Sequence, residues 1–503
     1  MLRHRLLIIV LLTTLALGLA GGADAAFYSK KETRKQKREQ RKELKKKGKQ
    51  EHKQAKLQKK KEKAANKKAT LEKKKNTPSR VQKKQQQKEL KKKQRQDRKN
   101  LKKELKKRKK AGTAIVNVPH PPPPSPVIVK KKREIIYPRT QMKPRYRIDV
   151  LAPMYLDDLV KDGSVTYKDK MPEKATAGIA FYEGVSIAAD SLKRAGFNID
   201  IYVHDVASAA ESADMLVKKG SLDTADLIIG AVQSHDIPML ADYAKRKQIN
   251  FISVLSASDA GVRDNEYFTM IQPSLKSHCM WIDSDVSRKF TGLKPAIIYR
   301  TSVPADSVAY SFITNDSGAK SNFKTLLCNS LPHKNDLLAL FDTTKPNVVI
   351  VPVLDNTYAD SLLKELSHDF PATHFEVYGM PSWNSIPSLR SGNPFPNLTI
   401  DVTTAVKIDP STAAAKYVSH TFKTDYGGKA SEIVYRGYET MFWYANLLKY
   451  YGTFFNTKYS DNTTAPFTKF EIKPSWDKND DLMFNENTRL YLTKYESGNT
   501  TTE

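Results

Sequence analysis

Cysteine is scarce in this chain of 503 residues, which contains only Cys279 and Cys328. Small scaffolds held together by disulfides are rich in cysteine, so the sequence excludes that class. Cys279 lies in a helix-like stretch and Cys328 in an apolar, strand-like one. The two thiols either form one disulfide or remain buried and free, and the sequence leaves both possibilities open.

Catalytic and cofactor motifs are also missing. The sequence has no HExxH, phosphate-binding loop, GxSxG or CxxC motif, and its ten histidines show no metal-ligand spacing. Ser234, His235 and Asp236 are adjacent at the start of an expected helix, whereas the members of a catalytic triad converge from separate parts of a fold. We interpret these three residues as a helix cap and expect a non-enzymatic protein with no metal and no cofactor.

Phe, Trp and Tyr are absent from residues 30–110, and other large apolar residues are few. This stretch holds 40 Lys and Arg residues and 9 Asp and Glu residues, so it accounts for the whole formal net charge of +31. Self-repulsion opposes compaction, and little apolar surface is available to offset the entropy of ordering. We therefore expect residues 27–112 to form an extended Lys-rich tail that becomes helical only transiently.

The excess of lysine predicts a polyanionic partner for this tail. Nucleic acid is not expected, because the aromatic residues that stack on bases are missing and arginine, whose planar fork suits phosphate, is the minority cation. Anions of the cell envelope fit better: peptidoglycan carboxylates, acidic glycans or anionic lipid headgroups. The alternative is a solvated spacer without a partner.

A long hydrophobic run occurs only at Leu6–Leu19, between Arg3 and Arg5 on one side and the small residues of Ala23-Asp24-Ala25 on the other. This pattern is typical of a secretory signal peptide, here residues 1–26. The run is shorter than the ~20 residues of a spanning helix. We expect an exported, periplasmic protein, and an uncleaved anchor is the alternative interpretation.

A linker is expected at 113–144, because it contains VPHPPPPSP, a sequence that favours polyproline II. From residue 145 to residue 503, apolar strands alternate with amphipathic helices such as Lys174–Ala195, which ends at Gly196. This alternation predicts parallel βαβ units. It restarts after Asp264 with the expected strand EYFTMIQPS, so the sequence predicts two α/β sets, at about 145–258 and 262–383.

The order of the motifs in 145–495 resembles the type I periplasmic binding proteins of the branched-chain amino-acid-binding kind. The matching motifs are FYEGVSIAADSL, ADLIIGAVQSHDIPMLADYAKRKQINFISVLSAS, YFTMIQPS, VPVLDNTYADSLLKEL, VYGMPSW and YRGYETMFWYANLLKYYG. The sub-group it most resembles comes from Bacteroidetes, where a peptidoglycan-binding LysM module often precedes this domain. The resemblance implies an α/β fold of two lobes, each a mostly parallel sheet flanked by helices, with a ligand cleft between them.

The resemblance also implies that ligand-binding groups come from the loops that follow the strands. By position these are Tyr155, Gln233, Ser234, Ser256, Ser258, Thr301, Ser302, Asp355, Asn356, Ser382 and Trp383. Hydroxyls and helix-end amides suit a carboxylate or another polar head, and the two aromatic residues suit apolar or stacking walls. The alternative for any single serine or asparagine is an ordinary helix cap.

Two functions from different classes remain open. The first is a periplasmic solute-binding protein that captures a small polar ligand, amino-acid-like or derived from the cell wall, while the tail associates with the envelope. The second is an envelope-tethered protein-interaction or regulatory module with a degenerate cleft. The polar loops after the strands and the motif order, which spans the whole domain, favour the first. Departures from the family favour the second: RTSVPADS replaces the Tyr-Gly-Glu-Gly of amino-acid binders, and YGMPSW lacks the usual acid, which leaves Asp355 as the nearby substitute.

Overall fold

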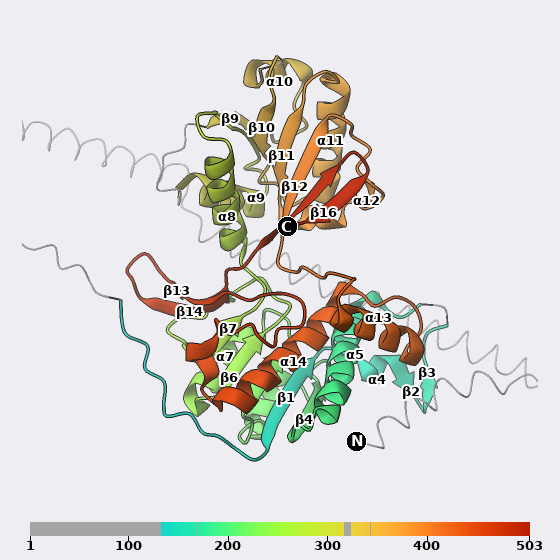
Figure 1. Ribbon diagram of the computed structural model, residues 1–503, viewed down its shortest axis with the longest axis vertical. Helices are drawn as coiled ribbons and strands as arrows, with labels where there is room; N and C mark the ends of the chain where they lie inside the picture. Colours follow the sequence, from blue (N-terminus) through green and yellow to red (C-terminus); the bar gives the residue numbers. More distant parts are fainter. Residues whose placement is uncertain (1–131, 169, 316–322, 343) are drawn as a thin grey trace, which may run out of the picture. The chain divides into compact units, whose positions relative to one another are not determined.

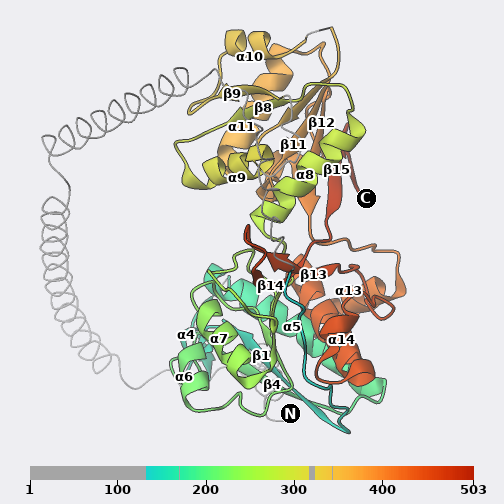
Figure 2. The ribbon, with the colours of Figure 1, turned by 90° about the vertical axis from the view of Figure 1, so that its left-hand side faces the viewer.

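Two seven-stranded sheets organise the part of the chain that the computed structural model describes, residues 132–168, 170–315, 323–342 and 344–503. The expected signal peptide, the Lys-rich tail and the linker as far as residue 131 lie outside the described residues. Each sheet and its helices form one lobe (Figures 1 and 2). This is the α/β architecture that the sequence predicts.

The first lobe has the strand order β13-β14-β7-β6-β5-β1-β4, in which only the β13–β14 pair is antiparallel. Side chains of β1 alternate between the two faces: Ile148 and Val150 pack with α5 and α14, and Leu151 packs with α6 and α7. The strands are β1 (Tyr146–Ala152), β4 (Ile199–Asp205), β5 (Leu227–Gly230), β6 (Asn250–Ser253), β7 (Phe268–Met270), β13 (Ile472–Trp476) and β14 (Leu482–Asn487). The helices are α4 (Leu156–Leu159), α5 (Glu173–Arg194), α6 (Ala213–Lys218), α7 (Ile237–Lys247), α13 (Ala413–Asp425), α14 (Glu432–Tyr451) and the 3-10 helix η2 (Phe455–Lys458), and a small hairpin joins β2 (Val160–Lys161) to β3 (Ser164–Val165).

The second lobe has the strand order β16-β15-β12-β11-β10-β8-β9, parallel from β12 to β9 and antiparallel at β15 and β16. Helices α8 and α9 lie on one side of this sheet and α11 lies on the other (Figure 1). The strands are β8 (Ala296–Tyr299), β9 (Lys324–Leu327), β10 (Asn347–Ile350), β11 (Phe375–Gly379), β12 (Leu398–Thr404), β15 (Tyr491–Glu496) and β16 (Asn499–Thr502). The helices are α8 (Leu275–Lys289), α9 (Pro304–Asn315), α10 (Lys334–Leu340), α11 (Asn356–Asp369), η1 (Pro381–Ser385) and α12 (Pro387–Arg390).

The predicted helix forms close to its expected ends. The helix expected at Lys174–Ala195 is α5, and Gly196 follows it with a φ of 72°, as expected for a helix stop. Helix α6 begins after Ser212, whose side chain accepts a hydrogen bond from the Met215 amide. The residues directly before Ser212 form turns.

The predicted division between the two α/β sets is wrong. The strand in EYFTMIQPS, β7, is hydrogen-bonded to β6 and β14 and therefore belongs to the first lobe. The chain passes from one lobe to the other three times: between β7 and α8, between β12 and α13, and between β14 and β15. Sequence alternation alone does not reveal these crossings, because each sheet is completed by strands far away in the chain.

Helices α5 and α14 lie side by side in both views (Figures 1 and 2). Two glycines permit the close approach. A Cβ atom at Gly184 would lie 2.0 Å from the carbonyl oxygen of Val434, and one at Gly437 would lie 2.2 Å from that of Phe181. The backbones therefore meet where any larger side chain would overlap the neighbouring helix.

Residues 132–145, here called the strap, run along the first lobe before β1 (Figure 1). The Thr140 hydroxyl donates to the carbonyl of Tyr451 at 2.7 Å, and the Tyr137 hydroxyl donates to the carbonyl of Glu266 at 3.3 Å. Burial raises the pKa of Tyr137 to about 12. The last part of the expected linker therefore contacts the first lobe.

Cys279 and Cys328 are both free and buried. Burial raises the pKa of the Cys279 thiol to about 12 and also raises that of Cys328. Of the two possibilities that the sequence left open, the structure has the buried free thiols. Within the described ranges, no helix combines the length and apolar character needed to cross a bilayer.

Candidate functional site

Tyr155 follows the carboxyl end of β1 and adopts the left-handed conformation, with a φ of 57°. A single carboxylate fixes this turn: Asp205 Oδ1 accepts hydrogen bonds from the backbone amides of Met154 at 2.8 Å and Tyr155 at 3.1 Å, and Oδ2 accepts one from Leu156 at 2.7 Å. The left-handed conformation is costly for a tyrosine, so Asp205 acts as its positioning residue. Sequence reasoning missed Asp205, although an acid at the end of the strand IDIYVHD was a usable signal.

Four other predicted residues lie after the neighbouring strands β5 and β6. Gln233 Nε2 donates to the hydroxyl of Tyr155 at 3.1 Å, and the hydroxyls of Ser234 and Ser256 lie 3.2 Å apart. The Ser256 hydroxyl also contacts the backbone of Ser258, accepting from its amide at 3.2 Å. All five predicted residues of the first lobe are thus gathered at the carboxyl edge of its sheet.

A pocket of about 570 Å³ opens at this edge and is lined by Val232, Gln233, Ser234, His235, Leu255 and Ser256. The pocket is broad and open to solvent. Apolar walls from Val232 and Leu255 stand beside hydroxyl and amide groups, which suits a small ligand with one polar end. The sequence did not single out Val232, Leu255 or His235 as lining residues.

The Ser234-His235-Asp236 sequence is not a triad. The His235 side chain is 72% exposed, and its Nε2 lies 3.4 Å from Asp236 Oδ1, whereas the Ser234 hydroxyl is paired with Ser256. Asp236 stands at the start of α7, but its side chain makes no capping hydrogen bond. Asp236 therefore occupies the cap position of α7 without the side-chain hydrogen bond of a cap. His235 borders the pocket.

In the second lobe the predicted polar groups are largely engaged within the lobe. The backbone amides of Thr301 and Ser302 donate to Asn329 Oδ1 at 3.0 and 3.1 Å. Asp355 caps α11, because its Oδ1 accepts from the amides of Thr357 at 2.9 Å and Tyr358 at 3.2 Å. The side chains of Thr301, Ser302 and Asp355 remain exposed.

Asn356 and Ser382 contribute mainly to local structure. Asn356 Nδ2 donates to the hydroxyl of Ser385 at 2.7 Å, and the Ser382 hydroxyl donates to the carbonyl of Leu354 at 2.9 Å. These bonds join the start of α11 to η1. They bring together the loops that follow β10 and β11.

Arg300, which sequence reasoning missed, lies beneath this group at the end of β8. Its guanidinium is buried, with Nε 2.7 Å from Asp306 Oδ2 and Nη1 3.6 Å from Asp355 Oδ2, and it lies 4.4 Å above the ring of Tyr358. One cation faces two carboxylates, so this edge of the second lobe carries a local negative balance. The sequence feature that could have identified Arg300 is its position directly after an apolar strand.

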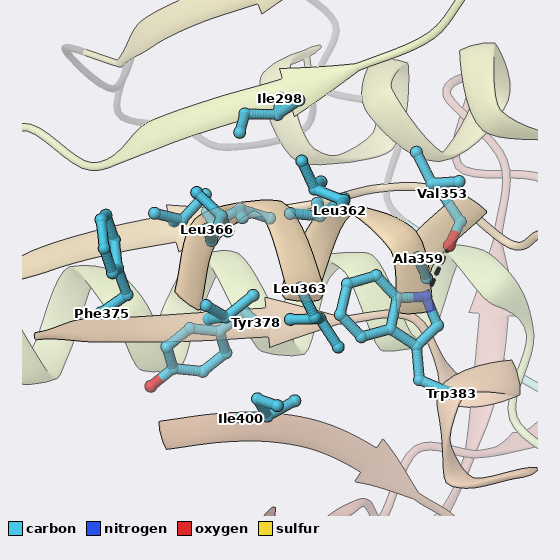
Figure 3. Close-up of a cluster of buried hydrophobic side chains, with 14 of the residues drawn as sticks. Ile298, Val353, Ala359, Leu362, Leu363, Leu366, Phe375, Tyr378, Trp383 and Ile400 are labelled. Atoms are coloured by element: carbon cyan, nitrogen blue, oxygen red, sulfur yellow. Dashed lines mark hydrogen bonds between the residues drawn. The ribbon is translucent and has the colours of Figure 1, made fainter. Parts of the chain in front are cut away.

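The prediction that Trp383 faces a ligand is wrong. Its side chain is fully buried in the second lobe, and its indole Nε1 donates to the carbonyl of Val353 at 2.8 Å (Figure 3). The ring lies over Gly379, where a Cβ atom would come within 2.2 Å of it. The glycine makes room for the indole inside the core, so the aromatic signal in YGMPSW reflects packing.

No group of three or more His, Cys, Asp or Glu residues within the described ranges is arranged to hold a metal ion. No protein-family model matches the sequence. No curated protein matches it either.

Solved structures do resemble it. A protein from Rhodospirillum rubrum assigned as a branched-chain amino acid ABC transporter has a TM-score of 0.52 and 11% identity, with 71% of this chain and 99% of that chain covered. A substrate-binding protein from Desulfitobacterium hafniense in complex with leucine has a TM-score of 0.45 and 14% identity, over 71% and 100% of the two chains. A solute-binding protein from R. palustris in complex with benzoate has a TM-score of 0.42 and 16% identity, over 71% and 95%.

At such low identities the likeness concerns the fold alone. The Rhodospirillum structure, with the highest TM-score of the three, supports this likeness. Two mostly parallel sheets flanked by helices, joined by three crossings, agree with that likeness along the described part of the chain. The chain has the two-lobed type I periplasmic-binding-protein fold.

Proposed function

We propose that this protein is a non-enzymatic, periplasmic solute-binding protein that receives a small polar ligand at the carboxyl edge of the first-lobe sheet. The observation that carries the proposal is the pocket formed by the loops after β5 and β6, where the hydroxyls of Ser234 and Ser256 stand beside Val232 and Leu255. Hydroxyl donors next to an apolar wall fit a ligand with a carboxylate head and a short apolar body.

The fold supports this placement. In open parallel sheets, ligands bind outside the carboxyl ends of the strands, where helix N-termini point. Helix α7 begins at Ile237, directly after the pocket residues, and Tyr155 with Gln233 extends the polar rim. The ligands bound by the similar structures, leucine and benzoate, both combine a carboxylate with an apolar group.

The proposal is tested by a thermal-shift screen of the full chain against amino acids, small aromatic acids and cell-wall fragments, with native mass spectrometry to detect any ligand retained on purification. A ligand at 100 times its Kd adds about 2.7 kcal/mol to the free energy of unfolding. Ser256→Ala should weaken binding roughly tenfold, since a hydrogen bond to a charged group is lost. Ser361→Ala, an exposed hydroxyl on α11, is the matched control and should bind as wild type does.

The Lys-rich tail adds the second half of the proposal, association with anionic polymers or surfaces of the cell envelope. Its charge carries this part, because the whole net charge of +31 lies in residues 30–110. The exported location follows from the expected signal peptide and belongs to the same proposal.

A protein-interaction module is the second candidate. Asp355, the acid expected to meet an α-ammonium, caps α11 and faces Arg300, which fits a second lobe that does not contact a ligand. If the screen yields no ligand, and Ser256→Ala leaves all properties unchanged, this candidate replaces the first.

A further inference from the structure

The strap exposes more apolar surface than its surroundings. The three most exposed large apolar side chains among the described residues are Ile136 at 78%, Met142 at 60% and Tyr450 at 57%. The first two lie on the strap, and Tyr450 lies at the end of α14, next to the Tyr451 carbonyl that holds Thr140. Isolated exposed apolar residues are common, but here three of them line one edge of one lobe.

Cations surround these residues. The strap holds Lys132, Arg133, Arg139, Lys143 and Arg145 against a single acid, Glu134. Four of the five make ion pairs with acids of the lobe: Lys132 with Asp480, Arg133 with Asp264 and Glu266, Lys143 with Asp226, and Arg145 with Asp200. The pairs of Lys132 with Asp480, Arg133 with Asp264 and Arg145 with Asp200 lie at the surface and are therefore weak. Lys143, in contrast, pairs with a buried carboxylate.

Helix ends bring further cations to this edge, and four of these cations pair with acids of the lobe: Lys218 with Asp214, Lys245 with Asp264, Arg246 with Asp242 and Lys247 with Asp223. The last four residues of α5, α6, α7 and α14 all include Lys or Arg and no acid: Lys193 and Arg194, Lys218, Lys245 with Arg246 and Lys247, and Lys449. Basic residues suit the negative end of a helix dipole. Because helices α5 to α7 run opposite to the parallel strands, their ends lie at the amino edge of the sheet.

The strap crosses that same amino edge. Pro144 accepts from Asn198, just before β4, Lys143 pairs with Asp226, just before β5, and Tyr137 bonds to Glu266, just before β7. The pocket lies at the opposite, carboxyl edge of the sheet. The Lys-rich residues 30–110 precede the strap in the sequence, and residues 111–131, which include the Pro-rich stretch, separate the two.

We propose that the basal face, meaning the strap with Lys449 and Tyr450, docks onto an anionic lipid bilayer. A bilayer offers both negative headgroups and an apolar layer in which Ile136, Met142 and Tyr450 lose contact with water. An acidic glycan offers the charge without the apolar layer. Docking would seat the first lobe with its pocket facing away from the membrane. This inference rests on the envelope association of the tail that forms part of the proposed function.

The test uses the full chain with a polarity-sensitive maleimide dye at one of two introduced cysteines, Met142→Cys on the strap or Ser258→Cys at the pocket edge. Cys279 and Cys328 are buried and do not compete for the dye. On vesicles of mixed anionic and zwitterionic lipid, the emission of the dye at 142 should shift to the blue and be quenched by brominated acyl chains. The dye at 258 should not respond.

A paired variant measures the apolar contribution. Ile136→Ser combined with Met142→Ser should lower vesicle affinity roughly tenfold in salt high enough to screen the tail. Leu293→Ser, a residue of the second lobe that is 53% exposed, is the matched control and should leave affinity unchanged.

These experiments distinguish failure of the basal-face proposal from failure of the proposed envelope association. Vesicle-bound protein with no response at 142 overturns the basal face but leaves the tail's role intact. An equal response to a soluble polyuronate assigns an acidic glycan and overturns the lipid assignment. Absence of any binding to vesicles or to polyuronate overturns both the basal face and the envelope association.

Discussion

Asp401 shows how one buried carboxyl links stability to pH. It lies fully buried on β12, paired in register with Lys494 on β15, whose Nζ is 3.9 Å away, and close to Glu376 on β11. Burial, together with the neighbouring Glu376, raises the pKa of Asp401 from its ordinary 3.8 to about 8, although Lys494 and Lys289 oppose the shift. The carboxyl is therefore protonated in the folded state at neutral pH.

The sign of the effect follows from this raised pKa. Between about pH 4 and pH 8 the folded protein keeps a proton that the unfolded chain has lost, so the free energy of unfolding falls as pH rises through this window. Asp401→Asn cannot ionise and should be more stable than wild type at pH 8–9, by roughly 2 kcal/mol. Chemical denaturation at pH 5 and pH 9 measures the difference. Asp425→Asn, at an exposed carboxyl, should show no such gain, and a wild-type stability that does not fall between these pH values would contradict the assignment.

Trp383 illustrates why the candidate site was only partly predictable at the residue scale. A serine that follows a strand can line a pocket or cap a helix. An aromatic residue in the same place can line a pocket or belong to the core. Ser234 and Ser256 do face a pocket, but the position of the indole depends on Gly379 and on a carbonyl thirty residues earlier, Val353. Such tertiary partners leave no periodic signal in the sequence.

The role of Trp383 can be checked by Trp383→Ala. Removing a fully buried indole leaves a cavity, so the free energy of unfolding should fall by about 3–5 kcal/mol. Thermal denaturation without ligand measures the loss. Ser382→Ala, at the neighbouring residue, should cost about 1 kcal/mol. A variant that keeps its melting temperature would return Trp383 to the list of ligand contacts.

At the scale of elements, the sequence predicted helices well because amphipathic spacing and stop residues are local. Helix α5, Glu173–Arg194, lies within one residue of both its expected ends, Lys174 and Ala195. The predicted boundary between the lobes was wrong, because β7 pairs with β14, which lies more than two hundred residues later in the chain. Nothing in the strand's own sequence specifies that partner.

The α5–α14 contact gives a prediction at this scale. Gly437→Ala places a methyl group 2.2 Å from the Phe181 carbonyl, so the helices must separate. The expected loss is about 1–3 kcal/mol, as for other overpacked cores. Denaturant titration measures it. Lys423→Ala, at an exposed position of α13, controls for the alanine itself, and an unchanged midpoint for Gly437→Ala would mean that the helices approach less closely.

At the scale of the whole molecule, the net charge and the folded domain occupy different parts of the sequence. Residues 30–110 hold the entire net charge, and the remaining chain has 45 basic and 45 acidic residues. This separation was readable from composition alone. The transition to folded structure was less readable, because the strap has the polar, Pro-containing composition of a linker and yet contacts the first lobe.

Deleting residues 30–110 should abolish adhesion to isolated cell envelopes and leave the melting temperature of the domain unchanged. Adhesion of the intact chain should weaken steeply as salt rises to ~0.5 M, since the screening length falls to a few ångströms. Sedimentation with envelope fragments measures both effects. Continued sedimentation of the deleted form would show that the tail is only a spacer.

The three crossings between the lobes also determine the order in which the chain can fold during synthesis. The parallel strands of the second lobe, from β8 to β12, occupy one continuous stretch, whereas the first-lobe sheet needs β14, which ends at Asn487. A growing chain can therefore assemble most of the second lobe while the first still lacks α14 and its last two strands. The exposed apolar face of α5 then waits for a helix made about 240 residues later, and this interval is when the nascent chain most needs protection from aggregation.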